Sequence, residues 1–172
     1  HMDWAVVEVD LRALVAAAAR ASSELFRARG AVLAEDLPPA VPVIRGDPDR
    51  LTQVLLNLLS NAAKFVPEGR GRATVRLREE PEALVVEVTD NGPGIAEADQ
   101  ALVFERFRQA GDSLSRPQGT GLGLPISREI VEHHGGGMWL DSRPGGGATF
   151  GFRLPKTPRG GQDNGHEGAD RG

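Results

Sequence analysis

The pattern of residues 47–65, DPDRLTQVLLNLLSNAAKF, limits the possible folds of this chain more than any other segment. Asp47 can cap a helix, and Pro48 would then occupy the first helical position, where proline is favoured. Apolar residues follow at helical spacing, namely Leu51, Val54, Leu55, Leu58 and Ala62. The segment therefore predicts an amphipathic helix whose apolar stripe packs on a second layer of the protein.

Segments with strand and helix patterns surround this helix. The expected strands cover residues 4–10, 31–37, 41–47, 73–80, 83–90, 138–142 and 148–155. Asp10 can cap a second helix that starts at Leu11 and runs to about Arg29, and Gly30 ends it. A third helix lies within residues 122–137 and ends at a run of glycines. Because some strands follow at hairpin distance while helices separate others, the order favours an α+β fold with one mixed sheet and helices on one face.

The composition is that of an ordinary globular domain. The chain has 172 residues, of which 40% are hydrophobic and 26% are charged. A net charge of −4 gives no broad basic surface, so no nucleic-acid partner is expected. The chain has no cysteine, which excludes disulfides and thiolate metal sites. No apolar run approaches the ~20 residues that a membrane span needs, so no direct membrane contact by this domain is expected.

Three segments are expected along the chain. Residues 1–2, His-Met, have the form of a cloning scar. Residues 3–156 carry all the expected helices and strands and form one domain. Residues 157–172 are rich in glycine and almost free of apolar side chains, so a disordered tail or linker is expected there.

The helix over residues 47–65 carries an unusual polar line. Asn57, Asn61 and Lys64 follow one another at spacings of four and three residues and so share one helix face. Asparagine is a poor helix former, so two on one line need a reason. One reading is a polar helix edge that hydrogen-bonds to neighbouring loops. The other is a site in which amide oxygens hold Mg²⁺ and the lysine attracts phosphate.

A second polar feature closes the strand over residues 83–90. Alternate residues of this strand point to one face, so the carboxylate of Asp90 ends an apolar wall. Gly92 and Gly94 follow in DNGPGI, and such a sequence is typical of a turn. Taken alone, the motif favours a plain turn over a binding site.

A glycine cluster, GTGLGL at residues 119–124, opens the third helix. Glycines let a ligand approach the backbone, and N–H groups at a helix start attract phosphate. The cluster is not a dinucleotide fingerprint, because Leu124 occupies the place of the last glycine. It is not a P-loop either, because neither Lys64 nor Lys156 follows a glycine. A glycine-rich helix start without a ligand stays open.

The ordered set NLLSNAAKF, DNGPGI, FERFRQ, GTGLGL and GGGATF strongly resembles the catalytic, ATP-binding domain of bacterial sensor histidine kinases. The resemblance covers about Val6 to Pro155. The wider superfamily includes gyrase, MutL and a heat-shock chaperone. The resemblance implies a Bergerat-type fold, which is a two-layer α/β sandwich with a mixed sheet, helices on one face and a mobile lid over ATP.

The resemblance also implies roles for individual residues. Asp90 would accept a hydrogen bond from the adenine amino group, and Thr149 would lie near the adenine and Asp90. The other residues implied at the base are Gly92, Gly94 and Ile95. The residues implied to hold Mg²⁺ and phosphate are Asn57, Asn61 and Lys64, and of these Asn57 and Lys64 would carry catalysis. The phosphate cradle would consist of Gly119, Thr120, Gly121, Leu122 and Gly123.

The lid of this resemblance spans residues 96–118 and adds two candidate ligands. Arg116 would touch phosphate, and Gln118 would join Asn57 and Asn61 around Mg²⁺. A solvated loop residue stays the alternative for each of the two lid residues.

The function implied is that of a protein-histidine kinase, which transfers the γ-phosphate of ATP to a histidine on a separate dimerisation domain. None of the four histidines of this chain stands in the acceptor motif of such kinases. The implied partners are an upstream dimerisation domain and the receiver domain of a response regulator. The isolated domain is expected to be monomeric and cytoplasmic, and the full-length protein to be a homodimer, with a membrane anchor left open.

Two alternatives to the kinase stay open. One is an ATP hydrolase of the gyrase or MutL type, and the other is a nucleotide-binding regulatory module without phosphotransfer. Asn57 argues against the hydrolase, because gyrase-like relatives carry a glutamate there. A carboxylate can activate water as a general base, whereas an amide cannot.

Overall fold

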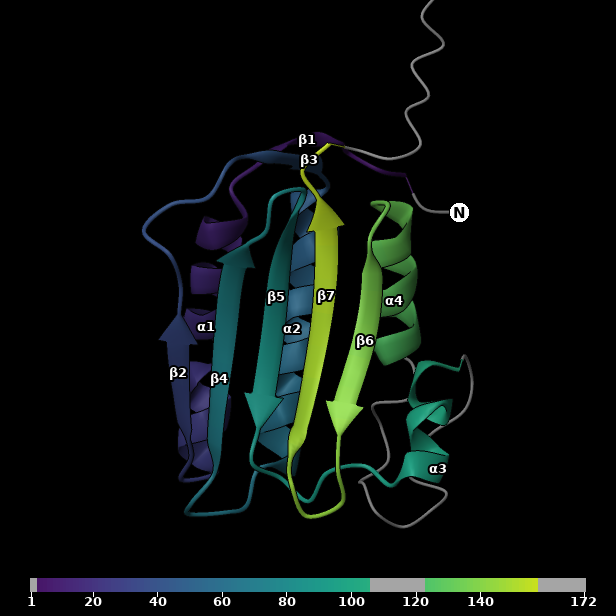
Figure 1. The fold of residues 1–172 in the computed structure, drawn as a ribbon. Helices are drawn as coiled ribbons and strands as arrows, with labels where there is room; N and C mark the ends of the chain where they lie inside the picture. Colours follow the sequence, from purple (N-terminus) through teal and green to yellow (C-terminus); the bar gives the residue numbers. More distant parts are fainter. Residues whose placement is uncertain (1–2, 106–122, 158–172) are drawn as a thin grey trace, which may run out of the picture.

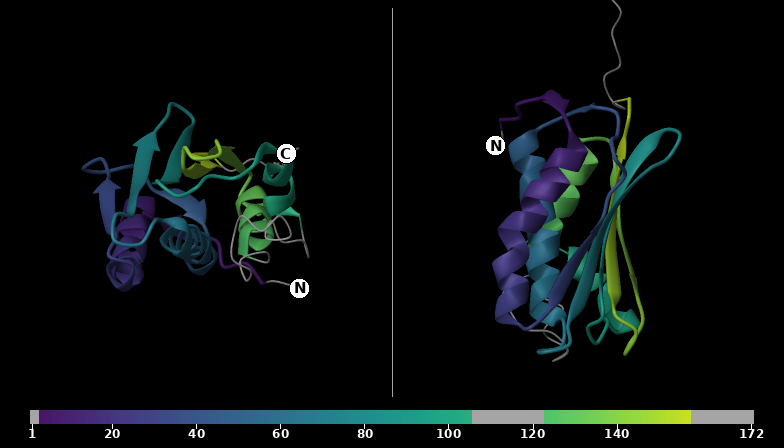
Figure 2. Two further views of the ribbon diagram at one scale, coloured as in Figure 1. Left: turned by 90° about the horizontal axis from the view of Figure 1, so that it is seen from below. Right: turned by 90° about the vertical axis from the view of Figure 1, so that its left-hand side faces the viewer.

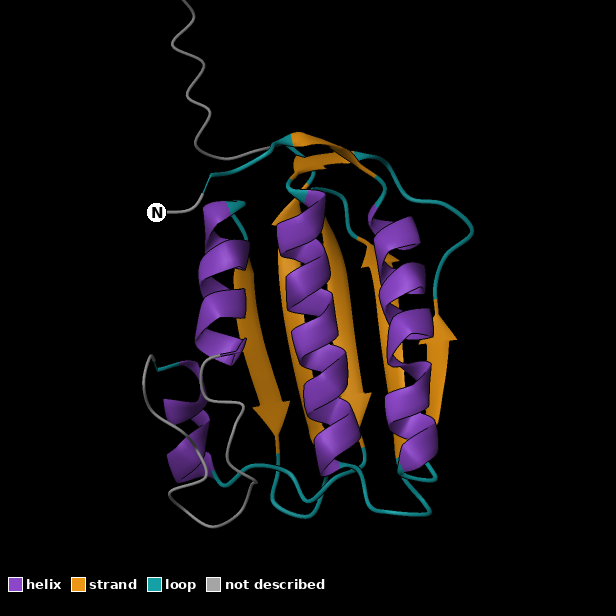
Figure 3. Cartoon of the chain, turned by 180° about the vertical axis from the view of Figure 1, so that it is seen from behind, coloured by secondary structure: helices purple, strands orange, loops and turns teal. Residues whose placement is uncertain are grey.

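Three helices cover one face of a five-stranded sheet in the computed structural model, which describes residues 3–105 and 123–157 (Figure 1). The helices are α1 (Leu11–Ala28), α2 (Pro48–Phe65) and α4 (Gly123–His133). Figure 3 shows them side by side in front of the sheet, and the right-hand view of Figure 2 shows the two layers in profile. The predicted α+β sandwich with helices on one face is confirmed.

The sheet has the strand order β2-β4-β5-β7-β6. Its strands are β2 (Val32–Asp36), β4 (Arg72–Glu79), β5 (Ala83–Asp90), β6 (Gly137–Ser142) and β7 (Ala148–Pro155). The β2 strand pairs with β4 in parallel, and the other pairs are antiparallel, so the sheet is mixed as predicted. The parallel pair is possible because the chain crosses over from β2 to β4 through β3 and α2.

The helix starts follow the capping pattern of the sequence. The Asp47 carboxylate accepts hydrogen bonds from the backbone N–H groups of Asp49 and Arg50, at 3.1 and 3.2 Å. Asp10 accepts one from Ala13 at 3.3 Å. The apolar stripe of α2 is buried and belongs to the same core cluster as the apolar residues of β5 and β7. The core therefore lies between the helical layer and the sheet. The polar residues of the candidate site lie at one end of this sandwich.

The first and third strands differ from the prediction of a single sheet. They are β1 (Val7–Val9) and β3 (Ile44–Gly46), and they pair antiparallel in a separate two-stranded sheet. This pair crosses one end of the sandwich (Figure 1, top). Val9 and Ile44 are opposite each other and buried, so the pair closes the core at this end.

Only the start of the expected lid belongs to the described residues. It holds the short helix α3 (Glu97–Gln100) and the 3-10 turn η1 (Leu102–Phe104). The ring of Phe104 meets that of Phe150 edge-on, with centroids 6.3 Å apart, and so attaches this segment to the core. Residues 106–118 of the lid and residues 158–172 lie outside the described residues. Among the helices that are described, none has the length and apolar character to cross a membrane.

Candidate functional site

The carboxylate of Asp90 lies buried at the end of β5. Only 4% of the residue is exposed, and its Oδ1 accepts a hydrogen bond of 2.9 Å from the backbone N–H of Gly92. It continues the buried face of the strand, on which Val86 and Val88 pack in the core. The structure thus places a carboxylate at the end of an apolar wall, as the alternation in the sequence predicts.

The two glycines after Asp90 allow close backbone contacts. A Cβ atom on Gly92 would lie 2.5 Å from the carbonyl oxygen of Phe65, the last residue of α2. Gly94 has φ +74°, and a Cβ atom there would overlap the carbonyl oxygen of Arg143. Ile95 follows and is buried. The glycines therefore bring the loop after β5 against the end of α2 and the β6–β7 turn.

Asn57 connects α2 to the start of α4. Its Nδ2 donates hydrogen bonds to the carbonyl oxygen of Gly123, at 3.2 Å, and to the hydroxyl of Ser127, at 3.0 Å. Gly123 is the first residue of α4 and belongs to the predicted phosphate cradle. One part of the plain reading, a polar helix edge bonded to its neighbours, is therefore present for Asn57. Ser127 was not predicted, although it stands one helical turn after Gly123 and so shares its face.

Asn61 is different, because its amide is buried and unsatisfied. The residue is 3% exposed, and neither Oδ1 nor Nδ2 has a hydrogen-bond partner among the described residues. Leaving such a group unpaired costs about 1–3 kcal/mol. Lys64, one turn further along the same face, is exposed. An unpaired buried amide beside a lysine fits a ligand that carries oxygen atoms, such as a phosphate with its cation.

Amide side chains are the candidate metal ligands here. Within residues 3–105 and 123–157 no three His, Asp or Glu side chains gather in a way that could hold a metal. Magnesium usually keeps several waters and binds through a few oxygens and substrate phosphates. The amide side chains present therefore fit a Mg²⁺ ion that arrives with a nucleotide.

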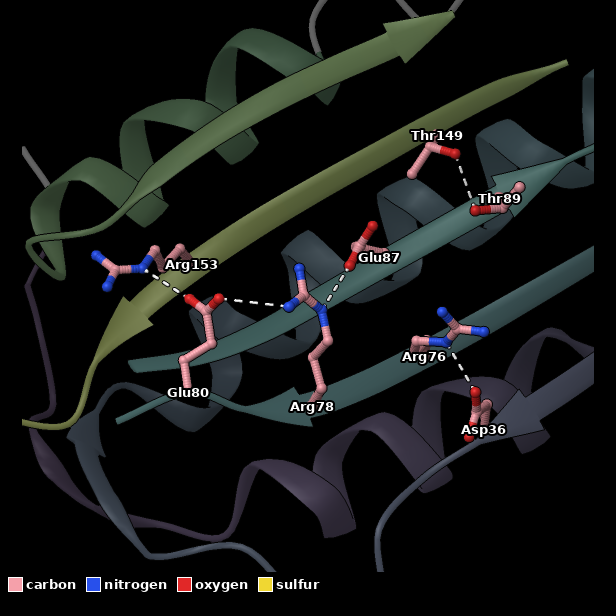
Figure 4. Close-up of polar contacts among 8 residues, drawn as sticks. All are labelled: Asp36, Arg76, Arg78, Glu80, Glu87, Thr89, Thr149 and Arg153. Carbon is pink, nitrogen blue, oxygen red and sulfur yellow. Dashed lines mark hydrogen bonds and ion pairs between the residues drawn. The ribbon is translucent and has the colours of Figure 1, made fainter. Parts of the chain in front are cut away.

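The predicted place of Thr149 near Asp90 is wrong. Strand pairing sets Thr149 opposite Thr89, and their hydroxyl oxygens lie 2.9 Å apart. Figure 4 shows both on the sheet face away from the helices, together with ion pairs such as Arg78–Glu87. Side chains alternate along a strand, so this face is opposite to that of Asp90.

Ala148 stands in the place that was expected for Thr149. It pairs directly with Asp90, is 2% exposed and belongs to the core. The order of residues in the motif GGGATF does not determine which of them faces the core. A shift of one position moves a side chain to the opposite face of the sheet.

Six predicted site residues lie outside the described residues: Arg116, Gln118, Gly119, Thr120, Gly121 and Leu122. Of the remaining ones, Gly123 begins α4 and Thr149 lies on β7, and the others lie on two elements, α2 and the end of β5 with the loop after it. The contact between Gly92 and the end of α2 joins these elements.

A buried carboxylate and a buried unpaired amide at one end of an α/β sandwich define a candidate nucleotide site. The family model described as histidine kinase-, DNA gyrase B- and HSP90-like ATPase matches residues 46–158. The chain therefore belongs to this family of ATPases. The match begins before α2 and ends after β7, so it includes both elements of the site.

The relatives of the chain are sensor histidine kinases. It is 44% identical over 117 residues to the circadian input-output histidine kinase CikA of Synechococcus elongatus. The matched region covers 67% of this chain and 15% of CikA. The catalytic domain of histidine kinase ThkA has the same fold, with a TM-score of 0.78 and 29% identity over 90% of this chain and 99% of that domain. These similarities confirm the resemblance to histidine kinase catalytic domains.

Two further structures contain larger assemblies. Full-length ShkA in complex with AMPPNP is similar with a TM-score of 0.79 and 29% identity, over 92% of this chain and 32% of ShkA. ThkA in complex with response regulator protein TrrA is similar with a TM-score of 0.75 and 28% identity, over 90% of this chain and 43% of that chain. The chain thus spans a minor part of its longer relatives, and the similarity concerns their catalytic domain.

Proposed function

We propose that this domain binds ATP with Mg²⁺ and transfers the γ-phosphate to a histidine of a separate dimerisation domain. The observation that carries the proposal is the buried amide of Asn61, which has no partner among the described residues. Helical spacing puts it on one face with Asn57 and Lys64. A buried polar group of this kind is explained by a ligand that completes its hydrogen bonds.

The base of the nucleotide is proposed to bind at Asp90. Its carboxylate would accept a hydrogen bond from the adenine amino group, and such a bond to a charged acceptor contributes about 1.5–3 kcal/mol. The backbone at Gly92 and Gly94 and the side chain of Ile95 would border the base. AMPPNP, which is bound to the similar kinase ShkA, is an analogue of ATP and supports this ligand class.

The phosphates are proposed to extend from this loop toward α2 and the start of α4. Asn57 and Asn61, with Gln118, would hold Mg²⁺, which when bound neutralises charge on the phosphates. Lys64 would add a positive charge near the phosphates. The glycine cluster that ends at Gly123 would offer backbone N–H groups, and Arg116 of the lid a further cation.

The proposed acceptor needs no base from this domain. A neutral imidazole is already a nucleophile near neutral pH. Hydrolysis by water would need a general base, and the amide of Asn57 cannot take a proton. The amide nitrogen of Asn57 is in addition engaged with Gly123 and Ser127, which suits a residue that holds the phosphate cradle in place.

The partners follow from the same proposal. A dimerisation domain would present the acceptor histidine, and a response regulator would then receive the phosphate. The complex of ThkA with the response regulator TrrA supports the second partner. The proposed location of these steps is the cytoplasm, and no nucleic acid takes part.

Calorimetry with ATP, in the presence of Mg²⁺ or of a chelator, tests the binding step. Asp90→Ala should weaken ATP binding about tenfold or more, since the lost bond exceeds ~1.4 kcal/mol. Asp141→Ala is the matched control, because this carboxylate is exposed on β6. Equal ATP affinity in wild type and Asp90→Ala would remove Asp90 from the site.

Radiolabelled ATP tests the transfer step. The domain alone should remain unlabelled, and it should label a dimerisation domain that is supplied separately. This reaction should be slow, because the two domains lack the high effective concentration that a tether provides. Label on the isolated domain would contradict the proposal.

A further inference from the structure

The side chains of Ser142 and Gln100 form hydrogen bonds that join the β6–β7 turn to the loop after β5, and these two residues are called the latch below. We propose that Ser142 and Gln100 are positioning residues that hold Ile95 and Asp90 in the geometry that recognises adenine. This inference rests on the proposed binding of the base at Asp90. Neither Ser142 nor Gln100 belongs to the motifs on which the family resemblance rests.

The hydroxyl of Ser142 is the centre of the latch. It accepts a hydrogen bond from the backbone N–H of Ile95 at 2.8 Å and donates one to the carbonyl oxygen of Gly147 at 2.8 Å. Ser142 is the last residue of β6, and Gly147 directly precedes β7. Both hydrogen-bonding functions of one hydroxyl are thus used, and they fix Ile95 to the turn between two strands.

The second partner of this hydroxyl touches Asp90 itself. Gly147 has φ +77°, and a Cβ atom there would overlap the backbone carbonyl oxygen of Asp90. The backbones of Gly147 and Asp90 are therefore in direct contact. Ser142 therefore binds Gly147, which packs against Asp90. It also binds Ile95, which lies in the loop that follows Asp90.

Gln100 completes the latch from the other side. Its Nε2 donates to the carbonyl oxygens of Ile95 and of Ser142, each at 2.9 Å. The side chain reaches these groups from α3, at the start of the lid. The backbone N–H of Gly145 adds a bond of 2.6 Å to the carbonyl oxygen of Pro93. Residues 93–95 are therefore held by contacts from the β6–β7 turn and from α3.

This arrangement predicts an effect on the base and not on the phosphates. The latch residues contact the loop backbone beside Asp90, whereas the proposed phosphate ligands among the described residues lie on α2 and at the start of α4. Loosening the latch lets Ile95 and Asp90 depart from the geometry that the adenine amino group requires. Inosine triphosphate carries a carbonyl in place of that amino group. Its binding therefore does not use the proposed hydrogen bond from the amino group to Asp90.

The test compares ATP with inosine triphosphate by calorimetry on the whole chain, in Mg²⁺. Ser142→Ala removes both hydrogen bonds of this hydroxyl, and the resulting displacement of Ile95 and Asp90 should weaken ATP binding about threefold to tenfold. The affinity for inosine triphosphate should change less, so the preference for ATP falls. Ser142→Thr keeps the hydroxyl and should restore the preference.

Two further variants complete the experiment. Gln100→Met keeps the length of the side chain and removes the donor, so it should lower the same preference for ATP. It tests the inference independently of whether Ser142→Ala folds. Ser23→Ala is the control, because it removes an exposed hydroxyl that bonds only within α1. Its affinities should equal those of wild type.

The outcomes separate this inference from the proposed function. Equal losses for both nucleotides, or unchanged affinities in Ser142→Ala and Gln100→Met, would overturn the latch while the wild type still binds ATP. Failure of the wild type to bind ATP would overturn the proposed function and the latch with it.

Discussion

The indole ring of Trp4 stacks on the imidazole ring of His133, with centroids 3.7 Å apart and ring planes 11° apart. His134 follows, and its Nε2 accepts a hydrogen bond of 3.0 Å from the backbone N–H of Asp47. The carboxylate of Asp47 accepts another of 2.9 Å from the backbone N–H of Ala5. The first described residues are therefore attached to the end of α4 and the start of α2, at the end of the sandwich opposite Asp90.

Trp4→Ala should lower the free energy of unfolding by about 1–2 kcal/mol, since an aromatic pair contributes about 0.5–1.5 kcal/mol beyond the burial of its area. Urea unfolding measures this change. Nucleotide affinity should stay within a factor of about two, because Trp4 is remote from the proposed site. Val6→Ala is the control, since Val6 is an apolar residue of the same segment that is 49% exposed. A loss as large in Val6→Ala would show that the stack contributes nothing particular.

Asp47→Ala should destabilise the protein in a pH-dependent manner. Burial acts to raise the pKa of Asp47, but hydrogen bonds from three backbone N–H groups and the positive charge of Arg50 together outweigh burial and lower the pKa below its ordinary 3.8. A depressed pKa in the folded state stabilises the fold above the unfolded value. The stabilisation is lost as the pH falls from about 3.8 through the lower folded pKa.

At neutral pH the loss of this cap should cost about 0.5–2 kcal/mol. Denaturant unfolding at a series of pH values should show the difference between wild type and Asp47→Ala shrinking in acid. Asp10→Ala is the matched variant, since Asp10 caps α1 through one exposed bond of 3.3 Å. A gap that is independent of pH at Asp47 would contradict the assignment.

Asn61→Leu should separate stability from binding. Leucine has a similar shape, and replacing an unpaired buried amide with it should leave the melting temperature unchanged or raise it. The same change removes a proposed Mg²⁺ and phosphate ligand, so ATP binding in Mg²⁺ should be largely lost. Thermal unfolding without nucleotide and calorimetry with ATP measure the two effects.

Asn57→Leu provides the contrast on the same helix face. Asn57 donates two hydrogen bonds, so its removal should lower the melting temperature as well as weaken binding. If Asn61→Leu also melted clearly below wild type, Asn61 would be structural and its role in the ligand site would fall.

The parts of the fold that could be predicted depend on local chemistry. The cap at Asp47 and the apolar stripe of α2 fix that helix by residue spacing alone. The carboxylate of Asp90 on the inner face of β5 follows from strand alternation. The sheet with helices on one face follows from the order of the elements.

The parts that could not be predicted depend on contacts between distant segments. The separate β1–β3 pair joins residues that no local pattern relates, as in the pairing of Val9 with Ile44. The latch at Ser142 reaches Ile95 over 47 positions of sequence. The inward face of β7 is set by its register with β5, which the motif GGGATF does not contain.

The register of β7 leads to a further prediction, because it exchanges the roles that were expected of Ala148 and Thr149. Thr149→Val removes a hydroxyl on the outer sheet face, where its partner is Thr89, so ATP affinity should stay within a factor of about two. Ala148→Val adds two methyl groups on the inner face, directly across from Asp90. Because this position is 2% exposed and close-packed, the added volume should displace Asp90 or the proposed base, and ATP affinity should fall about tenfold or more. Calorimetry on the two variants, with Thr89→Val as a second outer-face control, measures the contrast. If Thr149→Val lost binding and Ala148→Val kept it, the register that the structure gives to β5 and β7 would be wrong by one residue.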